Sequence, residues 1–307
     1  MPFSKWEILG FTFIVTVWGL NYPVSVVGIA NSAPIWLAFF RAFTAFLTFS
    51  VILHFLKIRV KFTRTQLFIG ILGGIPGTCL FFGLWFLGML TVDPGISSVL
   101  VTAYPLWMLF IAVPVLGEVP SKVKFAAAIF GFAGVALASN VLFQHANNNI
   151  TADIELLASG LGFGFMNILF KRYFHGKELL SVNRLQLLGG IISLAVWALL
   201  TEPLSMIKWN TAFIGSVLWI GLPGTAIAYT LWFILLSRYK ASSMGVYMFL
   251  IIVVALIASF FLYDETINAV QFLGIAIIII SIYVVNRNDE AGRSRSSALT
   301  DAEGTKI

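Results

Sequence analysis

Residues 76–86 read PGTCLFFGLWF, and residues 223–233 read PGTAIAYTLWF. Both segments begin with Pro-Gly-Thr and end with Leu-Trp-Phe, and five residues separate the two triplets in each copy. The second copy follows the first at a distance of 147 residues. Six identities at one spacing, without a gap, indicate that the chain consists of two related halves.

Three pairs of polar residues recur at nearly the same spacing. They are Glu118 with Glu265 at 147 residues, Asn21 with Asn167 at 146, and Arg41 with Arg184 at 143. A period this long indicates two repeated domains rather than a solenoid. We predict a first repeat at residues 1–143, a polar linker at 144–153 and a second repeat at 154–286.

The composition excludes an ordinary soluble domain. Of the 307 residues, 59% are hydrophobic and 10% are charged, whereas soluble domains carry about 25% charged residues. The single cysteine, Cys79, lies in an apolar run, so we expect no disulfide framework. The net charge of +6 comes from basic residues between apolar runs, which favours topology signals over a nucleic-acid interface.

The apolar runs predict an all-α membrane protein, because a spanning helix needs about 20 mostly apolar residues. Ten runs qualify, at residues 8–29, 34–56, 66–90, 94–116, 123–142, 154–172, 180–201, 211–237, 240–263 and 267–286. Residues 287–307 are rich in Arg, Ser and acids and lack aromatics, which predicts a disordered tail.

The basic residues predict the orientation of these spans. With a cytoplasmic N-terminus, sixteen of the nineteen Lys and Arg residues lie in inner segments and one, Lys208, lies in an outer loop. This positive-inside bias predicts that both termini are cytoplasmic in a multi-pass protein of the cell membrane. Five spans per repeat is an odd number, so the repeats cross in opposite directions. Inverted repeats of this kind are typical of secondary transporters.

Several short motifs occur in a characteristic order. They are Trp18-Gly19-Leu20-Asn21-Tyr22, Pro34 with Arg41 and Ala42, Ser97-Ser98-Val99-Leu100, Tyr104-Pro105, Leu116-Gly117-Glu118, and Gly131 with Gly134. Together they resemble the drug/metabolite transporter superfamily, specifically its EamA-type ten-helix members, over residues 8–286. The second half departs from the pattern, since Ile252 stands at the position equivalent to Pro105. The ninth span therefore lacks the proline that kinks it in the family.

The resemblance implies efflux or exchange of amino acids, metabolites or small toxic compounds by alternating access. It also implies a central cavity lined mainly by spans 1, 3, 4, 6, 8 and 9. Two alternatives stay open: a nucleotide-sugar or sugar-phosphate exchanger of the same superfamily, which needs two or more basic residues in the cavity, and a non-transporting membrane scaffold or sensor. The oligomeric state is not set by the sequence, and a monomer is compatible with it.

Enzymatic chemistry has no support in the sequence. We find no metal-ligand cluster, no nucleophile–base pair and no Walker sequence, so we expect no metal, no cofactor and no ATP hydrolysis. The interiors of the predicted spans also lack the carboxylates that proton-coupled carriers commonly use. This favours facilitated transport or exchange.

Nine polar or aromatic residues are candidate substrate contacts. They are Trp18, Asn21, Tyr22, Trp85, Tyr104, Asn167, Tyr229, Trp232 and Tyr247. For the two asparagines, ligand contact and interhelical hydrogen bonding are equally supported. Pro23 should free a carbonyl near residue 19 that Asn21 or a substrate could use. The aromatic residues could form a cavity wall for flat apolar or cationic solutes, or pack against lipid.

The remaining candidates are structural or gating residues. We expect Arg41 and Arg184 to extend to the membrane interface; alternatively, each holds a loop carbonyl or carboxylate at a gate and attracts anionic substrates. Pro76-Gly77 and Pro223-Gly224 should kink their spans or permit close helix packing. Glu118 and Glu265 should cap the helices that follow them rather than act as gates.

Overall fold

The computed structural model describes residues 4–92, 94–138, 149–263 and 268–304, and every regular element in these ranges is helical. The elements up to residue 138 are α1 (Lys5–Ala30), α2 (Pro34–Phe55), α3 (Arg64–Leu72), η1 (Ile75–Leu80), α4 (Phe81–Gly88), α5 (Pro94–Val101), α6 (Tyr104–Leu116) and α7 (Lys122–Ala138). The later elements are α8 (Ile150–Tyr173), α9 (Lys177–Thr201), η2 (Leu204–Met206), α10 (Thr211–Gly221), η3 (Leu222–Ile227), α11 (Ala228–Arg238), α12 (Ala241–Tyr247), α13 (Leu250–Tyr263) and α14 (Ala269–Gly304).

Nine segments of the described chain are long and apolar enough to cross a membrane. They are Lys5–Ala30, Pro34–Phe55, Arg64–Gly88, Ser97–Leu116, Ile150–Tyr173, Lys177–Thr201, Thr211–Arg238, Ala241–Ala258 and Ala269–Asn288. Each coincides with one of the ten predicted spans. The other predicted span, 123–142, extends beyond the described residues, and its described part is the 17-residue helix α7. The predicted all-helical membrane fold is confirmed.

Several helices begin where polar side chains satisfy their free backbone amides. Ser4 and Glu7 form a reciprocal capping box at α1, and Thr63 and Gln66 do the same at α3. Asn210 caps α10 by accepting a hydrogen bond from the amide of Phe213. Such caps stabilise a helix by about 1 kcal/mol and fix its first residue.

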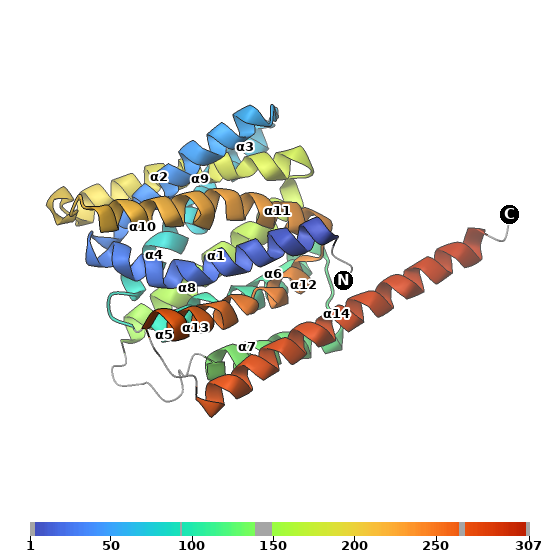
Figure 1. The fold of residues 1–307 in the computed structure, drawn as a ribbon. Helices are drawn as coiled ribbons and strands as arrows, with labels where there is room; N and C mark the ends of the chain where they lie inside the picture. The colour runs from blue at the N-terminus through green and yellow to red at the C-terminus, as the bar shows by residue number, and fades with distance from the viewer. Residues whose placement is uncertain (1–3, 93, 139–148, 264–267, 305–307) are drawn as a thin grey trace.

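The spans pack into one bundle in which corresponding helices of the two halves meet (Figure 1). Helix α2 packs along α9, and α7 packs along α14. The second contact is close because small residues face each other: a Cβ on Gly134 would lie 2.9 Å from the carbonyl oxygen of Gly274. Small residues at helix contacts are typical of membrane bundles, where they let backbones approach.

Both Pro-Gly-Thr segments interrupt their helices in the same way. Each lies in a six-residue π-helix, η1 between α3 and α4 and η3 between α10 and α11. Proline cannot donate the usual backbone hydrogen bond, so the helix widens locally. The close-packing alternative also applies, since a Cβ on Gly77 would lie 2.5 Å from Cγ of Met166 and one on Gly224 would lie 2.6 Å from Oδ1 of Asn21.

The fourth and ninth spans are also broken, at matching positions. Residues 102–103 separate α5 from α6, and residues 248–249 separate α12 from α13. The ninth span thus breaks without a proline. Helix α12 packs against α6, and Gly245 faces Pro105. A Cβ added to Gly245 would lie 3.3 Å from the Cα atom of Pro105. Close tertiary packing therefore accompanies this break, which the sequence did not predict.

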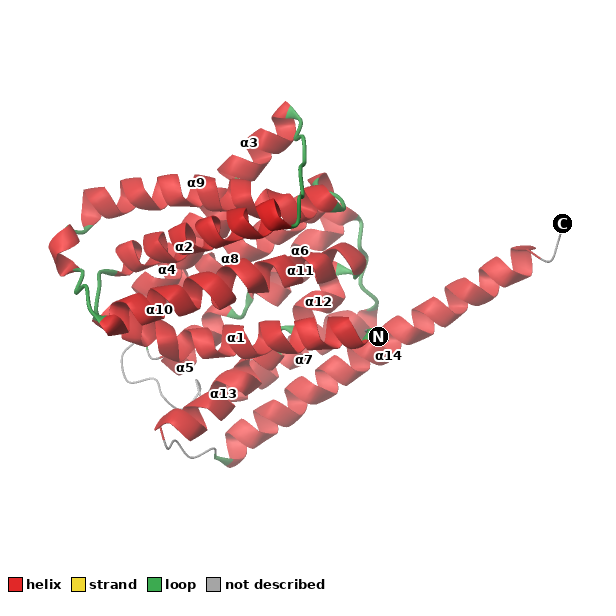
Figure 2. Ribbon diagram, turned by 45° about the horizontal axis from the view of Figure 1, so that its top comes forward, coloured by secondary structure: helices red, strands yellow, loops and turns green. Residues whose placement is uncertain are grey.

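The C-terminal segment differs from the disordered tail that its composition suggested. Helix α14 continues to Gly304 and extends well beyond the bundle (Figures 1 and 2). The segment after residue 287 contains no proline that would end the helix.

Candidate functional site

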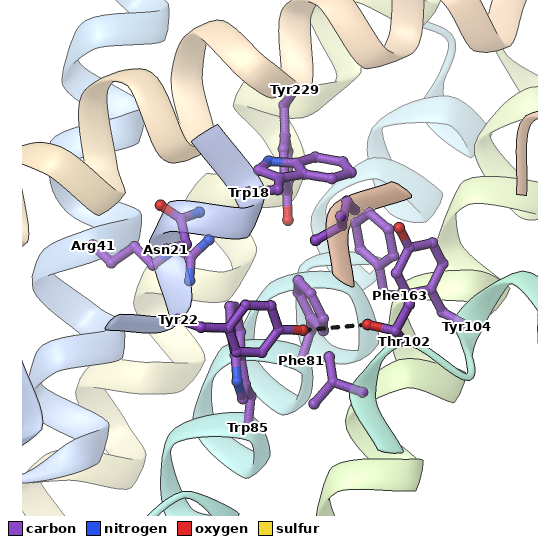
Figure 3. A pocket seen from close by; sticks show the side chains of 12 residues that line it. Trp18, Asn21, Tyr22, Arg41, Phe81, Trp85, Thr102, Tyr104, Phe163 and Tyr229 are labelled. Carbon is purple, nitrogen blue, oxygen red and sulfur yellow. Dashed lines mark hydrogen bonds between the residues drawn. The ribbon is translucent and has the colours of Figure 1, made fainter. Parts of the chain in front are cut away.

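A small cavity lies in the middle of the bundle, where both halves contribute walls (Figure 3). It is lined by Trp18, Asn21, Tyr22, Arg41, Phe81, Trp85, Val101, Thr102, Tyr104, Phe163, Tyr229 and Ile251. These residues come from spans 1, 3, 4, 6, 8 and 9, as the family resemblance implies, and from span 2 through Arg41. We call this space the central cavity. Its volume of about 30 Å³ holds one or two water molecules, which is less space than a small organic solute occupies.

Six of the nine predicted contacts line the central cavity. They are Trp18, Asn21, Tyr22, Trp85, Tyr104 and Tyr229. Their rings pack against one another: the Tyr22 and Trp85 centroids lie 5.2 Å apart, and Trp18 meets Tyr229 edge-on at 6.0 Å. The Tyr22 hydroxyl also forms a 3.3 Å hydrogen bond with the Thr102 hydroxyl. The walls are therefore built largely from aromatic rings that pack against one another.

Three predicted contacts lie outside the central cavity. The Trp232 indole donates a 2.6 Å hydrogen bond to Oδ1 of Asn167, whose amide nitrogen donates to the carbonyl of Phe163. Asn167 therefore joins helices, which was one of its two interpretations. Tyr247 is buried against Phe11, with ring centroids 6.1 Å apart.

Arg41 does not reach the membrane interface, so that prediction was wrong. Its side chain is 1% exposed and lines the central cavity. The Nε atom donates a 3.0 Å hydrogen bond to the Thr225 hydroxyl. The guanidinium carbon lies 3.9 Å from the centroid of Phe82 and 5.1 Å from that of Trp85. Aromatic faces and the widened helix at Thr225 hold this cation inside the bundle.

The central cavity holds a cation and no ionised acid. None of its described lining residues is Asp or Glu, and Arg41 forms no ion pair within the described chain. Five lining residues have a buried polar atom without a hydrogen-bond partner in the described structure. These atoms are Nη1 of Arg41, Oδ1 of Asn21, Nε1 of Trp85 and the hydroxyls of Tyr104 and Tyr229. Buried polar groups are normally paired, so this set is suited to a polar ligand.

The second Pro-Gly-Thr break supplies part of this arrangement. The carbonyl of Gly224 accepts a 3.0 Å hydrogen bond from the Trp18 indole and a longer one, 3.5 Å, from the Asn21 amide. We had expected Asn21 to use a carbonyl freed by Pro23, near residue 19. The carbonyl it contacts belongs instead to the opposite half of the chain, because the broken helix lies directly against α1.

Arg184 is exposed and does not line the central cavity; it lines a second cavity at the end of α2. The repeat spacing paired it with Arg41, but the residue that contacts the first Pro-Gly-Thr break is Gln186. Its amide nitrogen donates to the Gly77 carbonyl at 2.8 Å and to the Thr78 hydroxyl at 3.2 Å. The two halves therefore place different chemistry at equivalent breaks.

Glu118 acts as a cap, but on a different helix from the one predicted. It accepts hydrogen bonds from the amides of Ala241 and Ser242 at the start of α12, and it forms a 3.0 Å ion pair with Lys171. Burial raises the pKa of Glu118, but Lys171 and the hydrogen bonds outweigh burial and hold the pKa below its ordinary value of 4.5. Glu265 lies outside the described residues.

Five lining residues were not predicted: Phe81, Val101, Thr102, Phe163 and Ile251. Phe81 lies within the repeated segment and Thr102 lies between the two motifs of the fourth span, so their positions carried a signal. The other three are ordinary apolar residues of membrane helices, and only the packing distinguishes them from lipid-facing neighbours.

Comparison with known proteins shows the family to which this chain is related. The model of the EamA-like transporter family matches residues 5–140 and 150–287. The chain belongs to the EamA-like transporter family. Its similarity to a named relative extends over almost the full length: an uncharacterized transporter, YvbV, of Bacillus subtilis (strain 168) is 27% identical over 98% of this chain and 98% of the relative.

Two further relatives carry functional names. The S-adenosylmethionine uptake transporter of Rickettsia prowazekii (strain Madrid E) is 26% identical over 79% of each chain. The probable amino-acid metabolite efflux pump of Escherichia coli (strain K12) is 25% identical over 88% of this chain and 91% of the pump. The protein is thus a multi-pass membrane transporter of a small solute.

Proposed function

We propose that the protein moves a small organic solute bearing a carboxylate across the cell membrane by alternating access, as a facilitator or exchanger, and that Arg41 holds the carboxylate. The supporting observation is the environment of Arg41, a buried cation with no ion-pair partner in the described chain and with an unpaired Nη1 atom at the central cavity. Arginine is the side chain best suited to carboxylates, because its planar donors match both carboxylate oxygens.

The energetics favour a functional role for this cation. An arginine at the centre of a membrane span costs about 2.5–3.5 kcal/mol on insertion scales. The contact with Phe82 contributes about 2 kcal/mol when desolvated, and the Thr225 hydrogen bond adds about 1 kcal/mol. These terms nearly cancel, so Arg41 contributes little to stability. A charge-assisted bond to a ligand, worth about 1.5–3 kcal/mol, accounts for its presence.

The remaining unpaired atoms indicate what else the solute carries. Oδ1 of Asn21 is an acceptor, and it lies in the same cavity as Arg41. An α-amino acid would use both, with its carboxylate on Arg41 and its ammonium on Asn21 and the aromatic faces. The relatives named for S-adenosylmethionine and for amino-acid metabolites support this class, since S-adenosylmethionine carries an α-amino acid group.

The alternating-access mechanism rests on the two halves of the chain. The proposal assigns five spans to each repeat, with both termini in the cytoplasm. It receives support from the two matched segments, 5–140 and 150–287, and from the π-helical breaks at equivalent positions. Substrate sites in inverted-repeat carriers lie at such broken helices near the bilayer midplane.

Counterflow in proteoliposomes tests the proposal. Vesicles containing the purified protein are loaded with one unlabelled compound and supplied with its labelled form, using aromatic and aliphatic amino acids and their decarboxylated amines. We expect accumulation of amino acids but not of the matched amines, independent of a pH gradient. Equal accumulation of amines would contradict a carboxylate site, and dependence on the gradient would contradict facilitation or exchange.

The same assay separates the alternative functions. Accumulation of sugar phosphates or nucleotide sugars alone would favour the exchanger, although Arg41 is the single basic residue among the described lining residues. No accumulation of any compound, with folded protein in the vesicles, would favour the scaffold or sensor.

A further inference from the structure

A second cavity lies at the end of α2, beside α9, on the side that the positive-inside pattern assigns to the cytoplasm. Its volume is about 500 Å³, far larger than that of the central cavity. It is lined by Ser50, Leu53, His54, Lys57, Ile58, Arg59 and Arg184. We call it the basic cavity.

The basic cavity gathers positive charge without a balancing acid. Lys57, Arg59 and Arg184 are all exposed, no acidic residue lines the cavity, and none of the three forms an ion pair with an acid of the described chain. Like charges repel when they are brought together. A cluster of this kind at the level of the headgroups is therefore suited to an anion with several oxygen acceptors.

Lys57 occupies a backbone position that normally belongs to glycine. Its φ angle is +51°. The amide of Ile58 bonds to the Leu53 carbonyl at 3.1 Å and the amide of Lys57 to that of His54 at 3.0 Å, which is the Schellman pattern that ends a helix. A side chain in this left-handed conformation is disfavoured relative to glycine, so a lysine here weakens the turn while placing a cation at the cavity.

The basic cavity also contains an uncharged hydrogen-bond donor. The Ser50 hydroxyl is buried, lines the cavity and has no hydrogen-bond partner in the described structure. Ser50 and His54 are four residues apart on α2, so both side chains lie on one face of the helix. The cavity thus combines three cationic side chains with an unpaired hydroxyl.

Exposed apolar side chains continue from the basic cavity into the membrane region. On α9, Leu188 and Ile192 follow Arg184 at intervals of four residues, and on α2, Leu47 and Val51 precede Phe55 at the same interval. Ile192 is 56% exposed and Val51 is 52% exposed. Residues four apart share one helix face, so an apolar strip leads away from Arg184 on α9, and a second strip runs along α2 beside the face that carries Ser50 and His54.

We propose that the basic cavity binds the phosphate headgroup of an anionic phospholipid, with the acyl chains lying along these apolar strips. Basic pockets between spans on the cytoplasmic side are suited to such headgroups. A soluble phosphate compound would use the same cations but would leave the strips uncovered.

Native mass spectrometry of the purified protein in detergent, titrated with phosphatidylglycerol or phosphatidylcholine, tests this proposal. We expect tighter binding of phosphatidylglycerol, and about fivefold weaker binding for each charge removed in Arg59→Gln and Arg184→Gln. Arg184→Lys should keep most of the affinity. Lys122→Gln is the matched control, because Lys122 is an exposed lysine on α7, which packs against neither α2 nor α9.

A glycine variant separates lipid binding from folding. Lys57→Gly suits the left-handed turn and should raise the melting temperature, while weakening phosphatidylglycerol binding about fivefold. Unchanged phosphatidylglycerol binding in Lys57→Gly and Arg184→Gln would overturn the proposal. Equal binding of phosphatidylcholine, or displacement of the lipid by millimolar inorganic phosphate, would overturn it as well, the latter by showing a site for soluble phosphate.

Discussion

The two Pro-Gly-Thr breaks have the same π-helical backbone conformation but contact different side chains. In η1, the neutral amide of Gln186 covers Gly77 and Thr78. In η3, Trp18 and Asn21 contact Gly224, and the charged side chain of Arg41 contacts Thr225. The equivalent threonine therefore receives an amide in one half and a guanidinium in the other.

This difference shows how one duplicated motif serves two roles. The break in η1 is closed by neutral hydrogen bonds and acts as a helix contact. The break in η3 supports the residues that line the central cavity. A duplicated chain can thus keep the helix break in both halves while surrounding it with different side chains in each.

The largest expected effect comes from removing the charge at η3. Arg41→Met should abolish the carboxylate contact and weaken substrate binding by about 10- to 150-fold. It should change the free energy of unfolding by less than about 1 kcal/mol, because the terms that hold Arg41 nearly cancel. Counterflow and thermal unfolding of one preparation measure both quantities.

Gln186→Met is the matched variant at η1. It removes two hydrogen bonds to the break and should lower the melting temperature while substrate affinity is kept. If Gln186→Met lost substrate binding as fully as Arg41→Met, the two breaks would be functionally alike and the comparison would fail.

Variants of the two repeated tryptophans, Trp85 and Trp232, should also differ in whether they affect substrate binding or stability. Trp232→Phe leaves Oδ1 of Asn167 without its donor, which costs about 1–3 kcal/mol for a buried acceptor. Trp85→Phe loses no hydrogen bond within the described structure but changes a wall of the central cavity. We therefore expect a lower melting temperature for Trp232→Phe and a raised KM for Trp85→Phe, and the reverse result would contradict the site.

Alanine at the two break glycines should produce a smaller, graded effect. Overpacking typically costs about 1–3 kcal/mol, and both sites are tight. In Gly224→Ala the new methyl meets Asn21, a cavity residue, whereas in Gly77→Ala it meets Met166. Both variants should be less stable, and only Gly224→Ala should also bind substrate more weakly in counterflow titrations.

The smallest effect concerns the carboxylates that cap helices at opposite ends of the bundle. Glu118 has a cation beside it, whereas Glu202 caps α2 through the amides of Ile35 and Trp36. Burial raises the pKa of Glu202 and the two hydrogen bonds only partly offset it, so its pKa lies above the ordinary value while that of Glu118 lies below.

These opposite shifts predict opposite pH dependence. Ionised Glu118 stabilises the fold above about pH 4.5, and this contribution disappears as the pH falls through its lower folded pKa. Glu118→Gln should therefore cost about 1 kcal/mol at pH 7, and this cost should shrink only as the pH falls below about 4.5. Glu202→Gln should show no such recovery on acidification, because a raised pKa favours the fold at low pH. Melting temperatures measured from pH 7 to well below pH 4.5 test both expectations.

Much of the architecture could be predicted from the sequence because the signals were long and redundant. Runs of about 20 apolar residues identify spans without knowledge of their partners. Proline and glycine act on their own backbone, so the breaks at Pro76 and Pro223 were also local predictions. The ninth-span break at residues 248–249 was not predicted, since no proline or glycine lies at these two positions to indicate it.

The sequence by itself determined the helical membrane fold, the repeated motif and the aromatic character of the site, because each depends on composition or on the local backbone. The tertiary structure alone decided which polar residues meet. It placed Arg41 inside the bundle and Arg184 at a rim, and it put Gln186 where the repeat spacing had suggested an arginine. The physical reason is that a cation buried in a span is stabilised by aromatic faces and hydroxyls from distant helices, and these contacts have no counterpart in the spacing along the chain.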